Sequence, residues 1–144
     1  MKYSLDTNVI ISHLKADKFS DDTDRFFAWV RDFGYEMCIM DVVYAELYTG
    51  VYLSQNPVLE EGRIQKFLFV NNIEVGYLSP RISRRAGELY ANHLLKNRKK
   101  VFKRILPDFM IGAYAEQYSD IFITWNPSDY SINIPVRTPA EVTE

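Results

Sequence analysis

Tyr3-Ser4-Leu5-Asp6-Thr7-Asn8-Val9-Ile10-Ile11 places a carboxylate, a hydroxyl and an amide between two apolar runs. The pattern predicts a buried strand that ends at Leu5, a tight corner at residues 6–8, and a helix from Asn8 to about Leu14. A charged side chain between apolar segments is costly unless it is paired or binds a cation. The rest of the chain should therefore supply what shares a site with Asp6.

Short apolar segments alternate with amphipathic ones along the whole chain. Strands are expected at residues 2–5, 36–40, 73–78, 120–124 and 134–137, and helices at about 8–14, 25–33, 42–53, 59–71, 81–97 and 108–118. Asp41 is expected to cap the helix that follows it, and Pro107 suits a first helical turn. Residues 138–144 form a short tail or the start of a last helix. This alternation predicts an α/β fold, with helices on both faces of a central parallel sheet of four to five short strands.

The composition narrows the class of protein. At 144 residues with 47% hydrophobic side chains, the chain is expected to form one domain over residues 1–144. Cys38 is the only cysteine, which excludes an internal disulfide and a cysteine-rich metal site. There is no signal-peptide pattern, and no apolar run approaches the roughly 20 residues that span a bilayer. We therefore expect a cytoplasmic protein without a membrane partner.

Two further acids interrupt apolar stretches in the same way as Asp6. Glu46 lies in the second turn of its expected helix, and Asp108 lies in the first turn of another. Asp6 and Asp108 could each be simple helix caps. Glu46 lies past the first turn and has no such role, although it could be a solvent-exposed residue on the outer face of its helix. A parallel sheet could bring these acids and Thr124 to one edge, where open sheets bind ligands. Several converging oxygens suit a hard divalent cation such as Mg²⁺.

At these residues the sequence resembles the PIN-domain family of metal-dependent nucleases. Residues 5–8 (LDTN) are similar to its opening motif, 45–47 (AEL) and 107–113 (PDFMIGA) to its two later acidic motifs, and 124–130 (TWNPSDY) to its Thr-x-[Asp/Asn] segment with the acidic–aromatic pair that follows. The motifs occur in the family's order between residue 3 and about residue 140. The resemblance implies a three-layer α/β/α PIN-like fold in which Asp6, Glu46 and Asp108 bind the metal and Thr124 orients them.

One motif position departs from an all-acidic set. Asn126 stands two residues after Thr124, and an amide is a neutral, weaker ligand than a carboxylate. Asn126 is either a metal ligand or neighbour of one, or a plain turn residue. Asp129 either supplies the missing charge, directly or through water, or is an ordinary loop residue. We expect one well-defined Mg²⁺ or Mn²⁺ site and a second that fills mainly when substrate is present.

Residues 96–104 hold six basic side chains and no acid. Such a run is often a solvated loop, but its position just before Asp108 favours binding to the phosphates of RNA by Lys99, Lys100, Lys103 and Arg104. The resemblance further implies a stand-alone toxin ribonuclease of the VapC kind, paired as a homodimer and held in check by an antitoxin protein. Three alternatives stay open: a PIN nuclease outside toxin systems, a degenerate PIN domain that binds RNA or protein without cutting, and a phosphohydrolase on a similar sheet.

Overall fold

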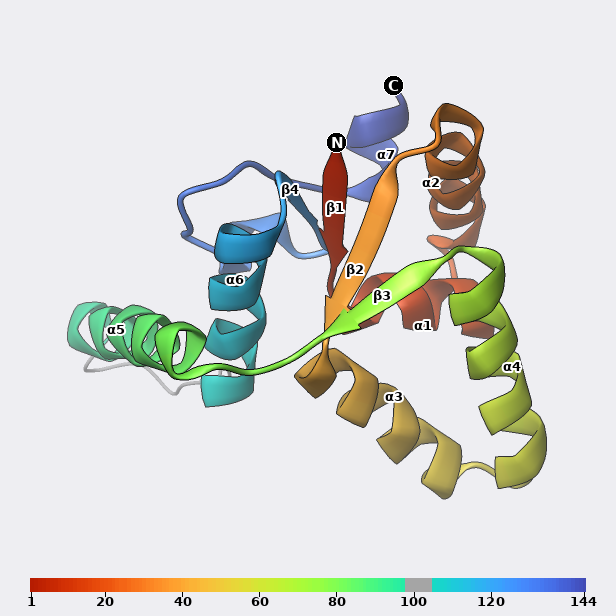
Figure 1. The fold of residues 1–144 in the computed structure, drawn as a ribbon, viewed down its shortest axis with the longest axis horizontal. Coiled ribbons are helices and arrows are strands. Elements are labelled where there is room, and N and C mark those ends of the chain that lie inside the picture. The colour runs from red at the N-terminus through yellow and green to blue at the C-terminus, as the bar shows by residue number, and fades with distance from the viewer. Residues whose placement is uncertain (98–104) are drawn as a thin grey trace.

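Five parallel strands form the centre of the computed structural model, which describes residues 1–97 and 105–144 (Figure 1). The strands are β1 (Lys2–Leu5), β2 (Glu36–Met40), β3 (Ile73–Gly76), β4 (Ile121–Ile123) and β5 (Val136–Arg137), in the order β3-β2-β1-β4-β5. The predicted α/β class and parallel sheet are confirmed. The two edge strands are shorter than residues 73–78 and 134–137, because only part of each stretch pairs with its neighbour.

Helices cover both faces of this sheet. They are α1 (Thr7–Lys15), α2 (Ser20–Phe33), α3 (Asp41–Leu53), α4 (Pro57–Val70), α5 (Pro80–Lys96), α6 (Leu106–Tyr118) and α7 (Pro139–Thr143). Figure 1 shows α6 on one side of the strands with α5 outside it, and α1, α2 and α7 on the other side. The three-layer arrangement is therefore confirmed. Within the described ranges, none of the helices combines the length and the apolar character needed to cross a bilayer.

The helix boundaries follow the local chemistry of their end residues. Gly34 ends α2 with φ 67°, a left-handed conformation that glycine adopts without strain. Asn56, expected in a loop before a helix at residue 59, caps α4 by accepting a hydrogen bond from the Leu59 N–H at 3.2 Å. The helix therefore begins at Pro57, whose fixed φ suits a first turn.

The prediction that Asp41 caps α3 is wrong. The β2 strand runs directly into the helix, so Met40 precedes the first turn and Asp41 is already helical. The Asp41 carboxylate instead accepts a hydrogen bond from the Leu78 N–H at 3.2 Å. It thereby ties the start of α3 to the segment that leaves β3.

The core fills the space between the sheet and its helices. Leu5, Phe122 and Ile123 are fully buried on the central strands. On the α6 side, Gly76 of β3 lies so close to Tyr114 that a Cβ atom at residue 76 would stand 2.6 Å from the tyrosine Cζ atom. The tyrosine ring thus occupies the space that a side chain would need, and only glycine fits at this position.

An ion pair braces the helices beside the loop after β4. The Arg85 Nε atom of α5 donates to Glu116 of α6 at 2.8 Å, and the second carboxylate oxygen of Glu116 accepts from the Asn133 N–H at 2.9 Å. Burial raises the pKa of Glu116, but these two donors lower it by more, so its pKa lies below the usual value. The brace fixes the loop that carries residues 126–134 against α5 and α6.

Candidate active site

The carboxyl ends of β1 and β4 lie side by side at the centre of the sheet. Leu5 pairs with Ile123, and the Asp6 N–H donates to the Ile123 carbonyl at 2.9 Å. The chain leaves β1 towards β2 on one side, whereas β4 lies on the other side. Strand order therefore reverses here, and open α/β sheets bind their ligands at such a point.

Asp6 is both a helix cap and the centre of a hydrogen-bond network. Its Oδ1 atom accepts from the Thr7 N–H at 2.8 Å, as expected of a cap on α1. Its Oδ2 atom accepts from the Thr124 hydroxyl at 2.8 Å and from the Tyr130 hydroxyl at 3.0 Å. The residue is only 8% exposed, so these donors hold a nearly buried carboxylate in one orientation.

Thr124 and Asn8 hold that network in place. The Thr124 hydroxyl, which is fully buried, accepts from the Asn8 side-chain amide at 3.2 Å and from the Asn126 N–H at 3.1 Å. The Asn8 carbonyl oxygen in turn accepts from the Trp125 N–H at 3.1 Å. With two donors aimed at its oxygen, the Thr124 hydroxyl has its own hydrogen left for Asp6. The Thr124 hydroxyl thus fixes the orientation of the Asp6 carboxylate, and its role at a metal site remains a prediction.

Glu46 and Asp108 lie close enough to Asp6 for the three charges to interact. The Thr7 hydroxyl donates to Glu46 Oε1 at 2.9 Å, which joins the start of α1 to α3. Burial raises the pKa of Glu46, the Thr7 bond lowers it, and the charges of Asp6 and Asp108 raise it again. For Asp6, burial again raises the pKa most and Asp108 adds to it, against the lowering by its hydrogen-bond donors. The three predicted acids thus form one electrostatic cluster, defined here as the acid cluster.

The acid cluster fits a divalent cation in charge and in donor type. A cation would offset the burial that raises the two pKa values most and the repulsion that adds to it, and the cluster offers only oxygen donors. Among residues 1–97 and 105–144, no three His, Cys, Asp or Glu side chains are close enough to hold a metal by themselves. A cation bound here would therefore need water or substrate oxygens as well, and Mg²⁺ commonly retains several waters.

The other predicted site residues lie around this cluster. Asn126 is exposed and precedes the 3₁₀ turn Pro127–Asp129, with its backbone N–H on Thr124. Asp129 is exposed too, and it lines a cavity between α5, α6 and its own loop rather than bonding to Asp6. Their roles as ligands remain predictions. The predicted RNA-binding residues Lys99, Lys100, Lys103 and Arg104 lie outside the described residues.

Three residues of the network were not among the predicted site residues. Thr7 and Asn8 are neighbours of Asp6 in the opening motif, and Tyr130 is the aromatic residue after Asp129. Their closeness to motif residues was the available signal. Because hydroxyl and amide side chains are uncharged, they do not stand out in an apolar stretch as candidate site residues in the way that a lone acid does. The Tyr130 bond joins residues 124 positions apart, which no local pattern could reveal.

Comparisons with known proteins found one matching family model and several solved structures with a similar fold. A model of the PIN domain matches residues 3–129. Similar folds occur in structures of VapBC2 from Rickettsia felis bound to a promoter DNA fragment (TM-score 0.76, 21% identity, covering 96% of this chain and 98% of that one) and of DNA-bound VapBC from Salmonella typhimurium (0.74, 21%, 96% and 98%). FitAcB from Neisseria gonorrhoeae is also similar (0.68, 19%, 95% and 97%). No curated protein matches the sequence.

Proposed function

The chain belongs to the PIN-domain family, and on that premise we propose that it is a cytoplasmic Mg²⁺-dependent endoribonuclease, the toxin of a toxin–antitoxin pair. The observation that carries the proposal is the acid cluster at the switch point of the sheet. Asp6 is nearly buried there, oriented by two hydroxyl donors, and close enough to Glu46 and Asp108 for their charges to interact. The two hydroxyl bonds to Asp6 Oδ2 go beyond the bond from the Thr7 N–H that the cap on α1 requires.

The chain's own residues divide the work of hydrolysis. Asp6, Glu46, Asp108 and Asn126 would hold Mg²⁺, or Mn²⁺ in its place. When bound, such a metal lowers the pKa of a water and offsets charge on the phosphate. Thr124 and Tyr130 keep the Asp6 carboxylate in position, and Thr7 does the same for Glu46.

The reaction follows from attack by water on phosphorus, in line with the leaving oxygen. The bond to the 3′ oxygen breaks, the leaving oxygen takes a proton, and the products carry a 5′-phosphate and a 3′-hydroxyl. The basic run at residues 96–104 would neutralise the phosphates of the RNA strand without reading its bases.

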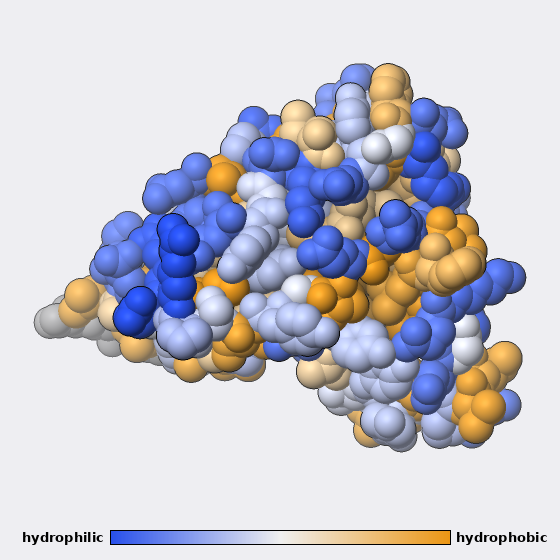
Figure 2. All heavy atoms as spheres, viewed as in Figure 1, coloured by the Kyte–Doolittle hydropathy of each residue, from blue (hydrophilic) through white to orange (hydrophobic). Residues whose placement is uncertain are grey.

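An antitoxin partner is supported by a partly apolar cleft that Glu46 helps to line. The cleft, of about 660 Å³, lies between α1, α3 and α4, and its lining includes Ile11, Leu47 and Ile64. Figure 2 shows apolar surface over the corner where α3 meets α4, where Leu53 and Val58 are more than 80% exposed. A protein segment with apolar side chains and one basic group would complement this surface and cover Glu46.

The proposed reaction is tested with total RNA and the purified, inhibitor-free protein. The wild type should cut RNA in the presence of Mg²⁺ and stop when EDTA is added, and sequencing of the fragments should find 5′-phosphates. Asp108→Ala, matched in fold by circular dichroism, should leave the RNA intact because one carboxylate of the cluster is gone. Intact RNA with the folded wild type would instead favour the degenerate, non-cutting PIN domain.

Tyr130→Phe isolates the role of one hydrogen-bond donor. The substitution removes only the hydroxyl that donates to Asp6 at 3.0 Å, and loss of an outer partner of a metal ligand typically costs about 10- to 100-fold in activity or metal affinity. We expect kcat for RNA cleavage to fall by about tenfold, and Mn²⁺ affinity, measured by calorimetry, to weaken as well. Tyr118→Phe, at the half-exposed end of α6, is the control and should match the wild type. Equal activity in both variants would remove Tyr130 from the site.

A further inference from the structure

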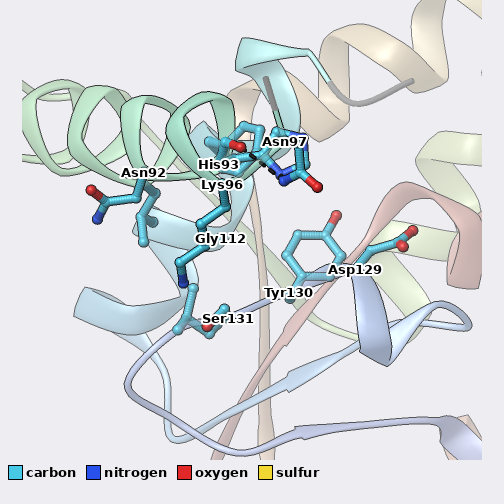
Figure 3. A pocket seen from close by; sticks show the side chains of 11 residues that line it. Asn92, His93, Lys96, Asn97, Gly112, Asp129, Tyr130 and Ser131 are labelled. Carbon is cyan, nitrogen blue, oxygen red and sulfur yellow. Dashed lines mark hydrogen bonds between the residues drawn. The ribbon is translucent and has the colours of Figure 1, made fainter. Parts of the chain in front are cut away.

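A cavity of about 140 Å³ lies beside the acid cluster, between α5, α6 and the loop after β4. Figure 3 shows residues of those three elements around the cavity, with Asn92 and Lys96 on α5 and Tyr130 and Ser131 on the loop. The inference below concerns what this cavity binds, and it rests on the proposed function.

The floor of the cavity is apolar and includes aromatic rings. Leu89, Phe109, Ile132 and the Tyr130 ring line it, and Gly112 contributes no side chain. Phe109 is itself fixed, because its ring stacks on another aromatic ring of α5 with centroids 5.1 Å apart and planes 9° apart. A flat, apolar-faced ligand would find rigid walls here.

The rim of the cavity is polar and able both to donate and to accept hydrogen bonds. Asn92 and Lys96 of α5 carry polar groups there, and Asn97, which follows α5, offers its amide carbonyl because its NH₂ group already bonds to His93. Asp129 and Ser131 line the cavity from the loop. An amide has two donors and a carbonyl acceptor. The rim thus suits a ring whose edge carries carbonyl, amino and N–H groups, which describes a nucleobase.

Tyr130 joins this cavity to the acid cluster. Its ring lines the cavity, whereas its hydroxyl donates to Asp6 Oδ2 at 3.0 Å. A base packed against the ring would therefore lie one side chain away from the carboxylate that is proposed to bind the metal. That separation suits a base on a nucleotide adjacent to the scissile phosphate.

We propose that this cavity binds one pyrimidine base next to the cleaved phosphodiester, and so determines which RNA sequences are cut. The ring size follows from the volume, because a cavity of about 150 Å³ holds a single benzene ring. A pyrimidine is one six-membered ring, whereas a purine has two fused rings. Base stacking on aromatic side chains and hydrogen bonds at the base edge would share the recognition.

Gly112→Ala tests the proposal without disturbing the fold. An added Cβ would stand 3.4 Å from Ile132 Cγ2 and from Tyr130 Cδ1, which is ordinary van der Waals contact, and it would narrow the cavity floor. Alanine also suits a helix interior better than glycine. Gly87→Ala in α5 is the matched control, since a Cβ there meets nothing within 4 Å.

The first measurement is cleavage of RNA with randomised bases on both sides of each cut. The wild type and Gly87→Ala should prefer a pyrimidine at one flanking position by about tenfold in kcat/KM, a factor typical of a pocket that discriminates by size. Gly112→Ala should reduce this preference to less than about threefold, and Asn92→Ala should change the ratio between uracil and cytosine. An unchanged preference in Gly112→Ala would overturn the proposal.

A second measurement does not depend on cleavage. Titration of the ¹⁵N-labelled wild type with uridine 5′-monophosphate in EDTA should shift the NMR signals of Gly112 and Asn92, whereas adenosine 5′-monophosphate should shift them less. If RNA is never cut but uridine 5′-monophosphate binds here, the proposed function fails and the base pocket stands. If RNA is cut but uridine 5′-monophosphate leaves these signals unmoved, the pocket proposal fails alone.

Discussion

Asp6→Asn is expected to lower kcat for RNA cleavage by about 10²- to 10⁴-fold. Charge stabilisation by a metal contributes several kcal/mol to such reactions, and each 1.36 kcal/mol corresponds to about a factor of ten. Asparagine keeps the size and one oxygen of the side chain but removes its charge. Initial rates on a defined RNA at saturating Mg²⁺ measure the loss directly. A decrease of less than about tenfold would show that Asp6 is not a metal ligand.

The same variant should still fold, with a limited loss of stability. Burial raises the pKa of Asp6, so the ionised carboxylate costs folding energy at neutral pH, and a neutral amide avoids this cost. The amide nitrogen of asparagine cannot accept a hydrogen bond, so it faces either the Thr7 N–H or the two hydroxyls that donate to Asp6. We expect the free energy of unfolding in EDTA to fall by at most about 3 kcal/mol, as measured by urea denaturation.

Asp120→Asn provides the matched control for that experiment. Asp120 accepts a hydrogen bond from the Lys2 N–H at 2.8 Å, at the opposite, amino end of the same two strands. The Asp120→Asn substitution makes the same chemical change beside the same pair of strands, at the end away from the acid cluster. Its RNA cleavage should stay within about twofold of the wild type, as for surface substitutions of small effect. A large loss here would point to the sheet rather than to the metal centre.

Gly76→Ala is expected to destabilise the fold by at least about 3 kcal/mol, the upper part of the usual range for overpacking. The new Cβ would stand 2.5 Å from Cε2 and 2.6 Å from Cζ of Tyr114. The ring is buried between α6 and the sheet and cannot move aside without shifting its neighbours. Thermal unfolding should show a midpoint roughly 10 °C lower, given about 2–4 °C per kcal/mol at this size.

Gly62→Ala separates this clash from the general effect of replacing glycine. A Cβ at Gly62 in α4 meets nothing within 4 Å, so alanine should raise stability by up to about 1 kcal/mol through helix propensity. Opposite signs for the two variants are the expected result. A neutral Gly76→Ala variant would mean that β3 and α6 are further apart than described.

The α/β fold could be predicted from the sequence because each buried parallel strand appears as a short run of apolar residues. Short apolar runs bounded by polar residues marked β1, β2 and β4, and amphipathic spacing marked the helices between them. Helix boundaries were harder to predict where a residue type occurs both in loops or caps and inside helices. Asn56 looked like loop and starts α4, while Asp41 looked like a cap and is already helical.

The candidate site was partly readable for a related reason. A lone acid in an apolar stretch, such as Glu46, signals an unusual environment, and three such acids in family order indicated one metal site. Asn8 and Tyr130 gave no such signal, because their importance comes from contacts made across more than 110 residues of chain. Only the folded sheet shows that they hold Thr124 and Asp6.

Because β1 pairs with β4, the contacts around Asp6 can form only late in the synthesis of the chain. Asp6 is made early, but its partners Thr124 and Tyr130 lie 118 and 124 residues later. At a ribosomal speed of about 5–20 residues per second, Tyr130 appears about 6–25 s after Asp6. Until then the nascent chain lacks the central strand pair and the donors that orient the first carboxylate. For the proposed nuclease, the hydrogen bonds that orient Asp6 can therefore form only after most of the chain has been made.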